Sequence, residues 1–400
     1  MPPSDTTATA NTDTAPLRGV RVLDLTRLLP GPLGTQYLAD MGADVIKIED
    51  TGAGDYAHPA LRAVCNRNKR GLQLDLKHPD GQAALVALAR TADVLIEGFR
   101  PGVTERLGAD YATLSRHNPR LVYCSLSGYG QDGPLRDAAG HDINYTGYTG
   151  VADQIGSAPD APALSNLPIA DVMGGALTAA LGILAALYDA QRSGRGRYLD
   201  IALADGALAG AVVALATLNE HGATRPAGGD ALSGALACYH QYRTHDGRYL
   251  AVGALEPKFW QAFCEQVLGR PDLVQWHRDP RPSQQESVRA ELQRIIGEQS
   301  LAYWRERLSG VDCCVTPVLK LEETLTHPHF IARGMVRRTM HPVYGEMAHL
   351  ASPIRMSGHT FDITRQAPLP GEHTREILRQ AGYADAAIDG LIANGIARTA

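Results

Sequence analysis

The sequence predicts an α/β protein with a parallel sheet in its larger part and a smaller second domain. Two observations carry this prediction. Apolar segments of strand type alternate with helical segments over residues 17–130, which is the pattern of an open parallel sheet. The pattern then becomes mainly helical over 170–220, and 400 residues exceed what a single hydrophobic core usually supports.

The first elements form a compact βαβ unit. The stretch "VRVLDLTRLLPGPLGTQYLADMGADVIKIE" contains a predicted strand at 20–25, a helix at 32–41 and a second strand at 44–49. Such a unit pairs its two strands in parallel through a right-handed crossover. The alternation continues with a helix at 81–91, a strand at 94–97, a helix at 111–117 and a strand at 121–125.

The second half of the chain has a different predicted order of elements. Apolar helices are predicted within 172–188 and 201–218, separated by a turn at 192–200 with Gly194 and Gly196. A Gly, Ala and Pro-rich hinge at 222–234 leads to a hairpin turn at 245–247, a small helical unit at 258–325, short strands and two closing helices. The predicted division is a disordered tail (1–16), a large domain (17–222), a small domain (223–328) and a return segment (329–400).

The composition excludes several classes of function. Apolar residues make up 44% and charged residues 20%, as in an ordinary globular protein. The net charge is −5 without a long Lys/Arg run, so no nucleic-acid partner is expected. The two apolar helices are diluted by Gly and Ala, and the second contains Asp205, so we expect core helices and no membrane contact.

The six cysteines indicate the compartment. They are scattered without C-x-x-C spacing, in a chain that opens without an apolar signal segment. We therefore expect a reduced, cytoplasmic setting and no metal site.

One glycine pattern raises the question of a dinucleotide cofactor. Gly128, Gly130 and Gly133 have G-x-G-x-x-G spacing after the apolar run 121–124. A dinucleotide site needs a helix that starts on this motif and an acidic residue about 20 residues further on. Here Pro134 follows at once, and 135–140 lacks helical periodicity. We therefore do not assign a dinucleotide site.

Three side chains are candidates for proton transfer, the usual work of imidazoles and carboxylates. His141 follows the glycine loop, Asp171 precedes an apolar helix, and Glu256 follows an apolar strand. His141 and Asp171 also have structural readings, because a His near a helix start is often only hydrogen-bonded and Asp is a preferred N-cap. Glu256 is less easily explained in this way, because ionised groups are rarely placed near cores without a partner. Spacing alone does not show that the three meet.

Seven blocks in order resemble one known family, the family III coenzyme A transferases and their relatives, the α-methylacyl-CoA racemases. The resemblance runs from 17 to 396. The blocks are "RVLDLTRLLPGPLGTQYLADMGADVIKIE", "NRNKRGLQLDLK", "EGFRPGVTERLG", "GYGQDGPLRDAAGHDINY", "ADVMGGALTAALGILAAL", "GRGRYLDIALADGAL" and "GEHTREIL". In this family the glycine loop lies near the acyl thioester, so its dinucleotide-like spacing is a coincidence.

The resemblance implies a Rossmann-like large domain built from both ends of the chain, a small middle domain, and a homodimer whose subunits interlock like rings. It implies an acyl-CoA substrate and no permanently bound cofactor. By their places in the matching blocks, the residues expected to hold CoA are Asn68, Lys69, Arg70, Arg100, Arg106 and Tyr145. Arginine also suits phosphate oxygens on general grounds.

Two chemistries compete within the family, and both use the aspartate matched by Asp171. In the transferases it is a nucleophile that forms an aspartyl anhydride. In the racemases it is an acid or base on one face of the α-carbon, the histidine matched by His141 serves the other face, and the glutamate matched by Glu256 supports the histidine. The backbone N–H of Asp142 would stabilise the enolate oxygen.

The blocks "GHDINY" and "GALEPKFW" favour the racemase reading. We therefore expect a racemase acting on 2-methylacyl-CoA, with a CoA transferase as the alternative and a non-catalytic acyl-CoA binder as a third possibility. The chain has one residue more between Asn166 and Asp171 than the racemase pattern, which leaves open whether Asn166 belongs to the site.

Overall fold

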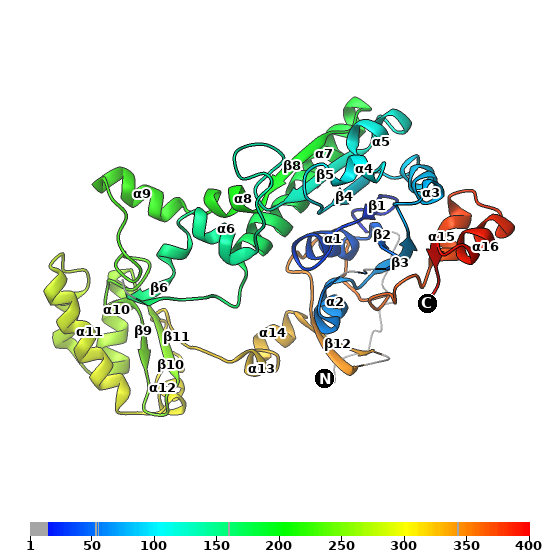
Figure 1. The fold of residues 1–400 in the computed structure, drawn as a ribbon. Coiled ribbons are helices and arrows are strands. Elements are labelled where there is room, and N and C mark those ends of the chain that lie inside the picture. Colours follow the sequence, from blue (N-terminus) through cyan, green and yellow to red (C-terminus); the bar gives the residue numbers. More distant parts are fainter. Residues whose placement is uncertain (1–14, 53, 55, 159–160, 342–343) are drawn as a thin grey trace, which may run out of the picture. The chain divides into compact units, whose positions relative to one another are not determined.

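The computed structural model describes residues 15–52, 54, 56–158, 161–341 and 344–400. Most of the predicted tail, 1–14, therefore lies outside the described residues. The chain divides into two compact units (Figure 1). Unit 1 comprises Met1–Thr149, Asn166–Gly210 and Ala332–Ala400, and unit 2 comprises Gly150–Ser165 and Ala211–Ile331.

Unit 1 is built on one seven-stranded sheet, which confirms the α/β class. The strands are β1 (Arg21–Asp24), β2 (Asp44–Glu49), β3 (Lys69–Leu74), β4 (Val94–Glu97), β5 (Val122–Ser127), β8 (Tyr198–Ala202) and β14 (Ala397–Arg398). They lie in the order β14-β3-β2-β1-β4-β5-β8. All neighbours pair in parallel except β14, which returns from the C-terminus and pairs antiparallel with β3.

Helices cover both faces of this sheet, because successive strand residues point to opposite sides. On β1, Val22 belongs to one core and Leu23 to the other. The core containing Leu23 is completed by α3 (Pro79–Ala89), α5 (Tyr111–His117), α15 (Thr374–Gln380) and α16 (Asp385–Ala393). The core containing Val22 is completed by α1 (Pro30–Asp40), α6 (Asp142–Tyr148), η3 (Ala170–Leu177), α7 (Thr178–Ser193) and α8 (Leu203–Ala209). The remaining elements of unit 1 are α2 (Pro59–Cys65), α4 (Val103–Arg106), β12 (Val336–His341) and β13 (Gly345–Leu350).

Unit 2 has its own core around an antiparallel three-stranded sheet. Its strands are β9 (Tyr239–Arg243), β10 (Tyr249–Gly253) and β11 (Val315–Pro317), and the predicted turn at 245–247 joins β9 to β10. Trp260, Phe263 and Trp304 fill the core under the surrounding helices. Besides the three-stranded sheet, the elements of unit 2 are η2 (Ala152–Gln154), β6 (Gly156–Ala158), β7 (Ala161–Pro162), α9 (Val212–His221), α10 (Pro257–Ala262), η4 (Phe263–Leu268), η5 (Pro271–Trp276), α11 (Pro282–Gly297), α12 (Leu301–Arg307), α13 (Leu321–Thr324) and α14 (Pro328–Ala332).

The two units differ from the predicted domain boundaries. Residues 150–165 and 211–222 were assigned to the large domain but group with unit 2. Local hydrogen bonds explain the difference. Gln154 donates to the carbonyl of Arg225 at 3.2 Å, and Thr217 donates to Asp230 at 2.6 Å, so both segments are tied to the loop that opens the small unit.

The helical run Ala170–Ser193 has the length and apolar composition of a membrane span, and half of its most apolar window is buried. Its buried side chains, which include Ala179, Ile183 and Ala190, belong to the core beside the sheet. The run is therefore accounted for as a core helix.

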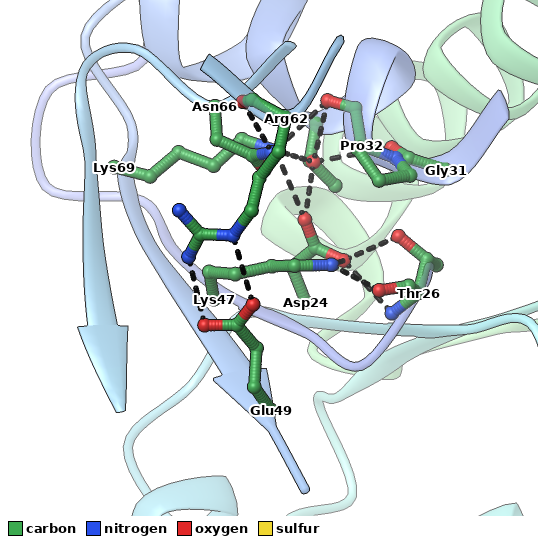
Figure 2. Close-up of polar contacts among 10 residues, drawn as sticks. Asp24, Thr26, Gly31, Pro32, Lys47, Glu49, Arg62, Asn66 and Lys69 are labelled. Carbon is green, nitrogen blue, oxygen red and sulfur yellow. Dashed lines mark hydrogen bonds and ion pairs between the residues drawn. The ribbon is translucent and has the colours of Figure 1, made fainter. Parts of the chain in front are cut away.

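A buried charge network lies at the carboxyl end of β1 (Figure 2). Asp24, Lys47 and Lys69 are all fully buried. Asp24 accepts from Lys69 at 3.1 Å, and the ammonium of Lys47 lies 4.0 Å from its other carboxylate oxygen. The two ammonium groups hold the pKa of Asp24 well below its usual range despite burial, which acts in the opposite direction. One carboxylate thus balances two buried cations.

Replacing Asp24 by asparagine is expected to lower the free energy of unfolding by about 3 to 5 kcal/mol, because two buried ammonium groups lose their counter-charge. Urea denaturation at pH 7 measures this loss. The same substitution at Asp385, which pairs with Arg379 on the surface, is the matched control and should change stability by less than about 1 kcal/mol. Equal effects at the two positions would show that the buried network does not stabilise the fold.

Candidate active site

The carboxyl ends of the parallel strands carry a cavity. Strand order reverses between β1 and β4, and ligands of open α/β sheets bind at such a reversal, outside the carboxyl ends of the strands. The cavity there has a volume of about 480 Å³. Its lining comes from the ends of β1 to β3 and from the segment after β4: Leu25, Arg27, Ile48, Glu49, Asp50, Tyr56, Leu74, Leu76, Lys77, Phe99, Val103, Arg106 and Leu107.

Three of these lining residues are cations. The guanidinium of Arg27 lies 5.1 Å from the ring centre of Tyr56 and 5.5 Å from that of Phe99. Arg106 is exposed and donates to the carbonyl of Gly102, and Lys77 lies 3.7 Å from Asp50 with three quarters of its side chain exposed. Cations beside aromatic faces suit a ligand that combines phosphates with a flat ring.

Arg106 was predicted from the sequence, whereas Arg27 and Lys77 were missed. A signal for both existed, because Arg27 follows β1 closely and Lys77 follows β3 closely, where the sheet rule places ligand contacts. Arg100 does not line the cavity. It is exposed, and its positive charge acts on the phenol of Tyr145.

The block "NRNKRG" places Asn68, Lys69 and Arg70 in hydrogen bonds within the fold. Lys69 is fully buried, and its ammonium donates to Asp24, Pro32, Thr35 and Asn66 at 2.8–3.1 Å. Arg70 is 5% exposed, and its guanidinium bonds to Asp44, Glu376 and Gln380. The side chain of Asn68 bonds to Asp40 and to the return segment at Asp362, Thr364 and Arg365. The printed contacts of all three side chains are thus made within this chain, and their role in holding CoA stays a prediction.

The glycine loop after β5 ends at His141. No helix starts at Gly133; α6 begins only at Asp142, so the geometry of a dinucleotide site is absent here. His141 is the exposed N-cap of α6, and its backbone N–H donates to Asn144 at 3.0 Å. This contact, together with the Asn144 N–H that donates to the His141 carbonyl at 2.8 Å, fixes the backbone at the start of α6.

Tyr145 packs into the same loop. Its hydroxyl donates to the carbonyl of Gly140 at 2.5 Å. A Cβ atom on Gly128 or Gly140 would lie 2.6 Å from the Tyr145 ring, so only glycine fits at both positions. Burial and the neighbouring Asp171 raise the pKa of Tyr145 to about 12. The phenol is therefore a neutral hydrogen-bonding group at physiological pH.

Asp142 and Asp171 are brought together by backbone contacts. One carboxylate oxygen of Asp142 accepts from the N–H of Ala170 at 2.7 Å and from that of Asp171 at 3.1 Å. Asp171 lies in the first turn of the π-helix η3. Turns of π-helix are rare in proteins, and those that occur are often at functional sites. Asp142 thus fixes where the Asp171 backbone begins its helix.

The carboxyl group of Asp171 titrates near neutrality. The pKa of Asp171 is raised to about 6. Burial is the largest cause, the negative charge of Asp142 acts in the same direction, and His141 opposes the shift. His141, Asp142 and Asp171 are therefore close enough for their charges to interact. A carboxylate with this pKa is suited to act as a general base or as a nucleophile near pH 7.

Glu256 belongs to unit 2, where it is the N-cap of α10. Burial raises the pKa of Cys314, and the negative charge of Glu256 acts in the same direction. The contact of Glu256 with His141 of unit 1 stays a prediction. Among the described residues, no group of three or more His, Cys, Asp or Glu side chains could hold a metal ion.

Comparison with known proteins identifies the class. The chain matches the model of CoA-transferase family III over residues 17–374, so it belongs to this family. It is 35% identical over 369 residues to a human protein named alpha-methylacyl-CoA racemase, covering 92% of this chain and 94% of that protein. It is 30% identical to mouse succinyl-CoA:glutarate CoA-transferase, covering 95% and 90%. The solved structure of a CAIB/BAIF family protein from Brucella suis superposes with a TM-score of 0.79 at 29% identity, covering 92% of this chain and all of that one.

Proposed function

We propose that the protein is an acyl-CoA racemase that interconverts the stereoisomers of a 2-methylacyl-CoA through an enolate. Racemisation needs two groups that exchange protons with opposite faces of the α-carbon and a donor for the enolate oxygen. The observation that carries the proposal is the clustering of an imidazole, His141, with a carboxyl group of pKa about 6, Asp171. The backbone N–H of Asp142, the first residue of α6, is the proposed oxyanion donor.

The experiment is incubation of the protein with one enantiomer of a 2-methylacyl-CoA in deuterated water. A racemase incorporates deuterium at the α-carbon and yields both enantiomers. Transfer of CoA to an added dicarboxylate without α-proton exchange would support the alternative and reject the racemase.

That alternative is a CoA transferase in which Asp171 attacks the thioester. It is supported by the relatives named as CoA-transferases, which are 30–32% identical over 90% or more of this chain. For that reaction Asp171 alone supplies the nucleophile, and the imidazole of His141 has no required role.

We further propose that CoA lies in the cavity at the carboxyl ends of β1 to β4, with phosphates on Arg27 and Arg106. Replacing either arginine by alanine is expected to weaken CoA binding about tenfold or more, because a charge-assisted hydrogen bond contributes about 1.5 to 3 kcal/mol. Isothermal titration calorimetry with CoA measures this. Arg116, exposed on α5 and outside the cavity, is the matched control, and equal affinity in Arg106→Ala and Arg116→Ala would exclude the assignment.

A homodimer is proposed as the working state. Helix α7 exposes large apolar side chains at helical spacing, with Leu181 70% and Tyr188 64% exposed, and such a surface is characteristic of an interface. Sedimentation equilibrium at micromolar concentration should give twice the chain mass of 42.8 kDa, and dilution should not release a folded monomer because interlocked chains must open before they part. A stable folded monomer would contradict this state.

A further inference from the structure

We propose that Glu97 is a proton-linked positioning residue: its ionised form fixes the loop 98–102, here called the CoA loop, and its protonated form loosens that loop and weakens CoA binding. The inference rests on the proposed CoA cavity, and it assigns a role to a buried carboxyl group that the proposed chemistry does not use.

Glu97 is the last residue of β4 and only 2% exposed. One carboxylate oxygen accepts the backbone N–H of Phe99 at 2.7 Å, inside the CoA loop. The other accepts the hydroxyl of Ser125 on β5 at 2.5 Å, and Tyr198 on β8 donates to Ser125 at 3.2 Å. The carboxylate therefore connects the start of the CoA loop to β5, the neighbour of β4, and through Ser125 to the edge strand β8.

The CoA loop carries contacts of the proposed site. The ring of Phe99 lines the cavity and lies against the guanidinium of Arg27. The loop ends at α4, which carries Arg106. A shift of the loop at Phe99 would thus move an aromatic wall of the cavity and the start of the helix that holds a proposed phosphate ligand.

The surroundings of Glu97 disfavour its negative charge. Burial raises its pKa to about 7, and the nearby carboxylates of Glu105 on α4 and Asp200 on β8 contribute in the same direction. The two hydrogen bonds from Ser125 and Phe99 lower it only in part. The other titratable neighbours are Tyr123 and Cys124 on β5 and Tyr198 on β8, whose own pKa values are raised. The group therefore changes charge in the physiological range.

The change of charge alters the bond to the loop. A carboxylate accepts a charge-assisted hydrogen bond from the Phe99 N–H, and such bonds are about twice as strong as neutral ones. Protonation leaves a neutral acceptor, so the loop is held less firmly below about pH 7. Fixing a loop in its bound conformation improves affinity because less ordering is needed on binding.

The test is the affinity for CoA between pH 5.5 and 8.5, measured by calorimetry for the wild type and for Glu97→Gln. The ratio of the two affinities is the readout, because a CoA phosphate with a pKa near 6 affects both proteins alike. We expect a ratio near one at low pH and about fivefold tighter binding by the wild type at high pH, with the midpoint near pH 7. A ratio that does not vary with pH would overturn the proposal.

Two further variants separate titration from a purely structural role. Ser125→Ala removes a hydrogen bond that favours the charged form, so the midpoint should move to higher pH. Glu105→Gln removes a repelling charge, so it should move to lower pH. A structural role alone predicts uniform weakening without opposite displacements, and that outcome would also overturn the proposal.

Hydrogen exchange tests the role of Glu97 independently of CoA binding. If the protein binds no CoA, hydrogen exchange of the backbone amides at 98–100 and 102 still reports on the loop. We expect Glu97→Gln to exchange like the wild type at pH 6 and faster than the wild type at pH 8. Equal exchange at both pH values would reject the role of Glu97 whether or not CoA binds.

Discussion

Asp171→Asn is expected to reduce racemisation of a 2-methylacyl-CoA by at least about 10³-fold, since a carboxamide cannot exchange a proton with the α-carbon. Under the transferase alternative the same variant loses CoA transfer, because a carboxamide is not a nucleophile. Chiral chromatography of the hydrolysed product measures the first activity. Asp189→Asn on α7, which removes an exposed ion pair with Arg197, is the matched control and should retain wild-type activity.

The pH dependence of the racemisation rate tests the ionisation of Asp171. Asp171 has its pKa raised to about 6, and it must be ionised to act as a base, so the rate should rise as the pH increases through about 6. Asp142→Asn keeps an acceptor for the two backbone N–H groups and removes the repelling charge. The acidic limb of the profile should therefore move to lower pH. A limb that stays in place would show that another group controls it.

His141→Ala should abolish racemisation yet leave α-proton exchange from one enantiomer only, because a single remaining base still reaches one face of the α-carbon. Asp171→Asn should show the opposite preference. Deuterium incorporation into each pure enantiomer, followed by mass spectrometry, measures the preference. The exchange rate of the disfavoured enantiomer should fall by about 10² to 10⁴-fold, the usual contribution of a general base.

The fold should survive His141→Ala, because the Asn144 side chain caps α6 through the backbone N–H of residue 141, which alanine retains. Asn144→Ala removes the acceptor of that contact and is the complementary variant. This variant should lower the α-proton exchange rates of both enantiomers equally, because the loop that carries His141 would be misplaced. Unchanged CoA transfer to a dicarboxylate in His141→Ala, combined with no exchange in the wild type, would reject the racemase in favour of the transferase.

The family and the fold class could be determined from the sequence alone, because both depend on local and ordered features. The βαβ unit is encoded by apolar strands of fixed length around a helix that begins at a proline, and the structure places β2 and β4 at their predicted residues. The matching blocks run along the chain in order, and the family match covers 17–374. Neither inference requires knowing which distant segments touch.

Among the strands that escaped prediction, β3 and β8 did so for a physical reason. β3 begins with Lys69 and Arg70, whose charges look like surface residues until Asp24 and Asp44 neutralise them. β8 is an edge strand with alternating exposure, and its residues 201 and 202 run directly into an apolar helical segment. In both cases the partner that makes the strand stable lies far away in the sequence.

The surroundings of the charged residues were decided only by the tertiary structure. Motif position suggested that Lys69 and Arg106 both hold phosphates, yet one is buried against a carboxylate and the other lines an open cavity. Arg27 reaches that cavity because the ends of parallel strands gather at one edge of the sheet. A cation's function depends on whether a carboxylate or solvent faces it, and that is set by long-range packing which the spacing of residues along the chain does not encode.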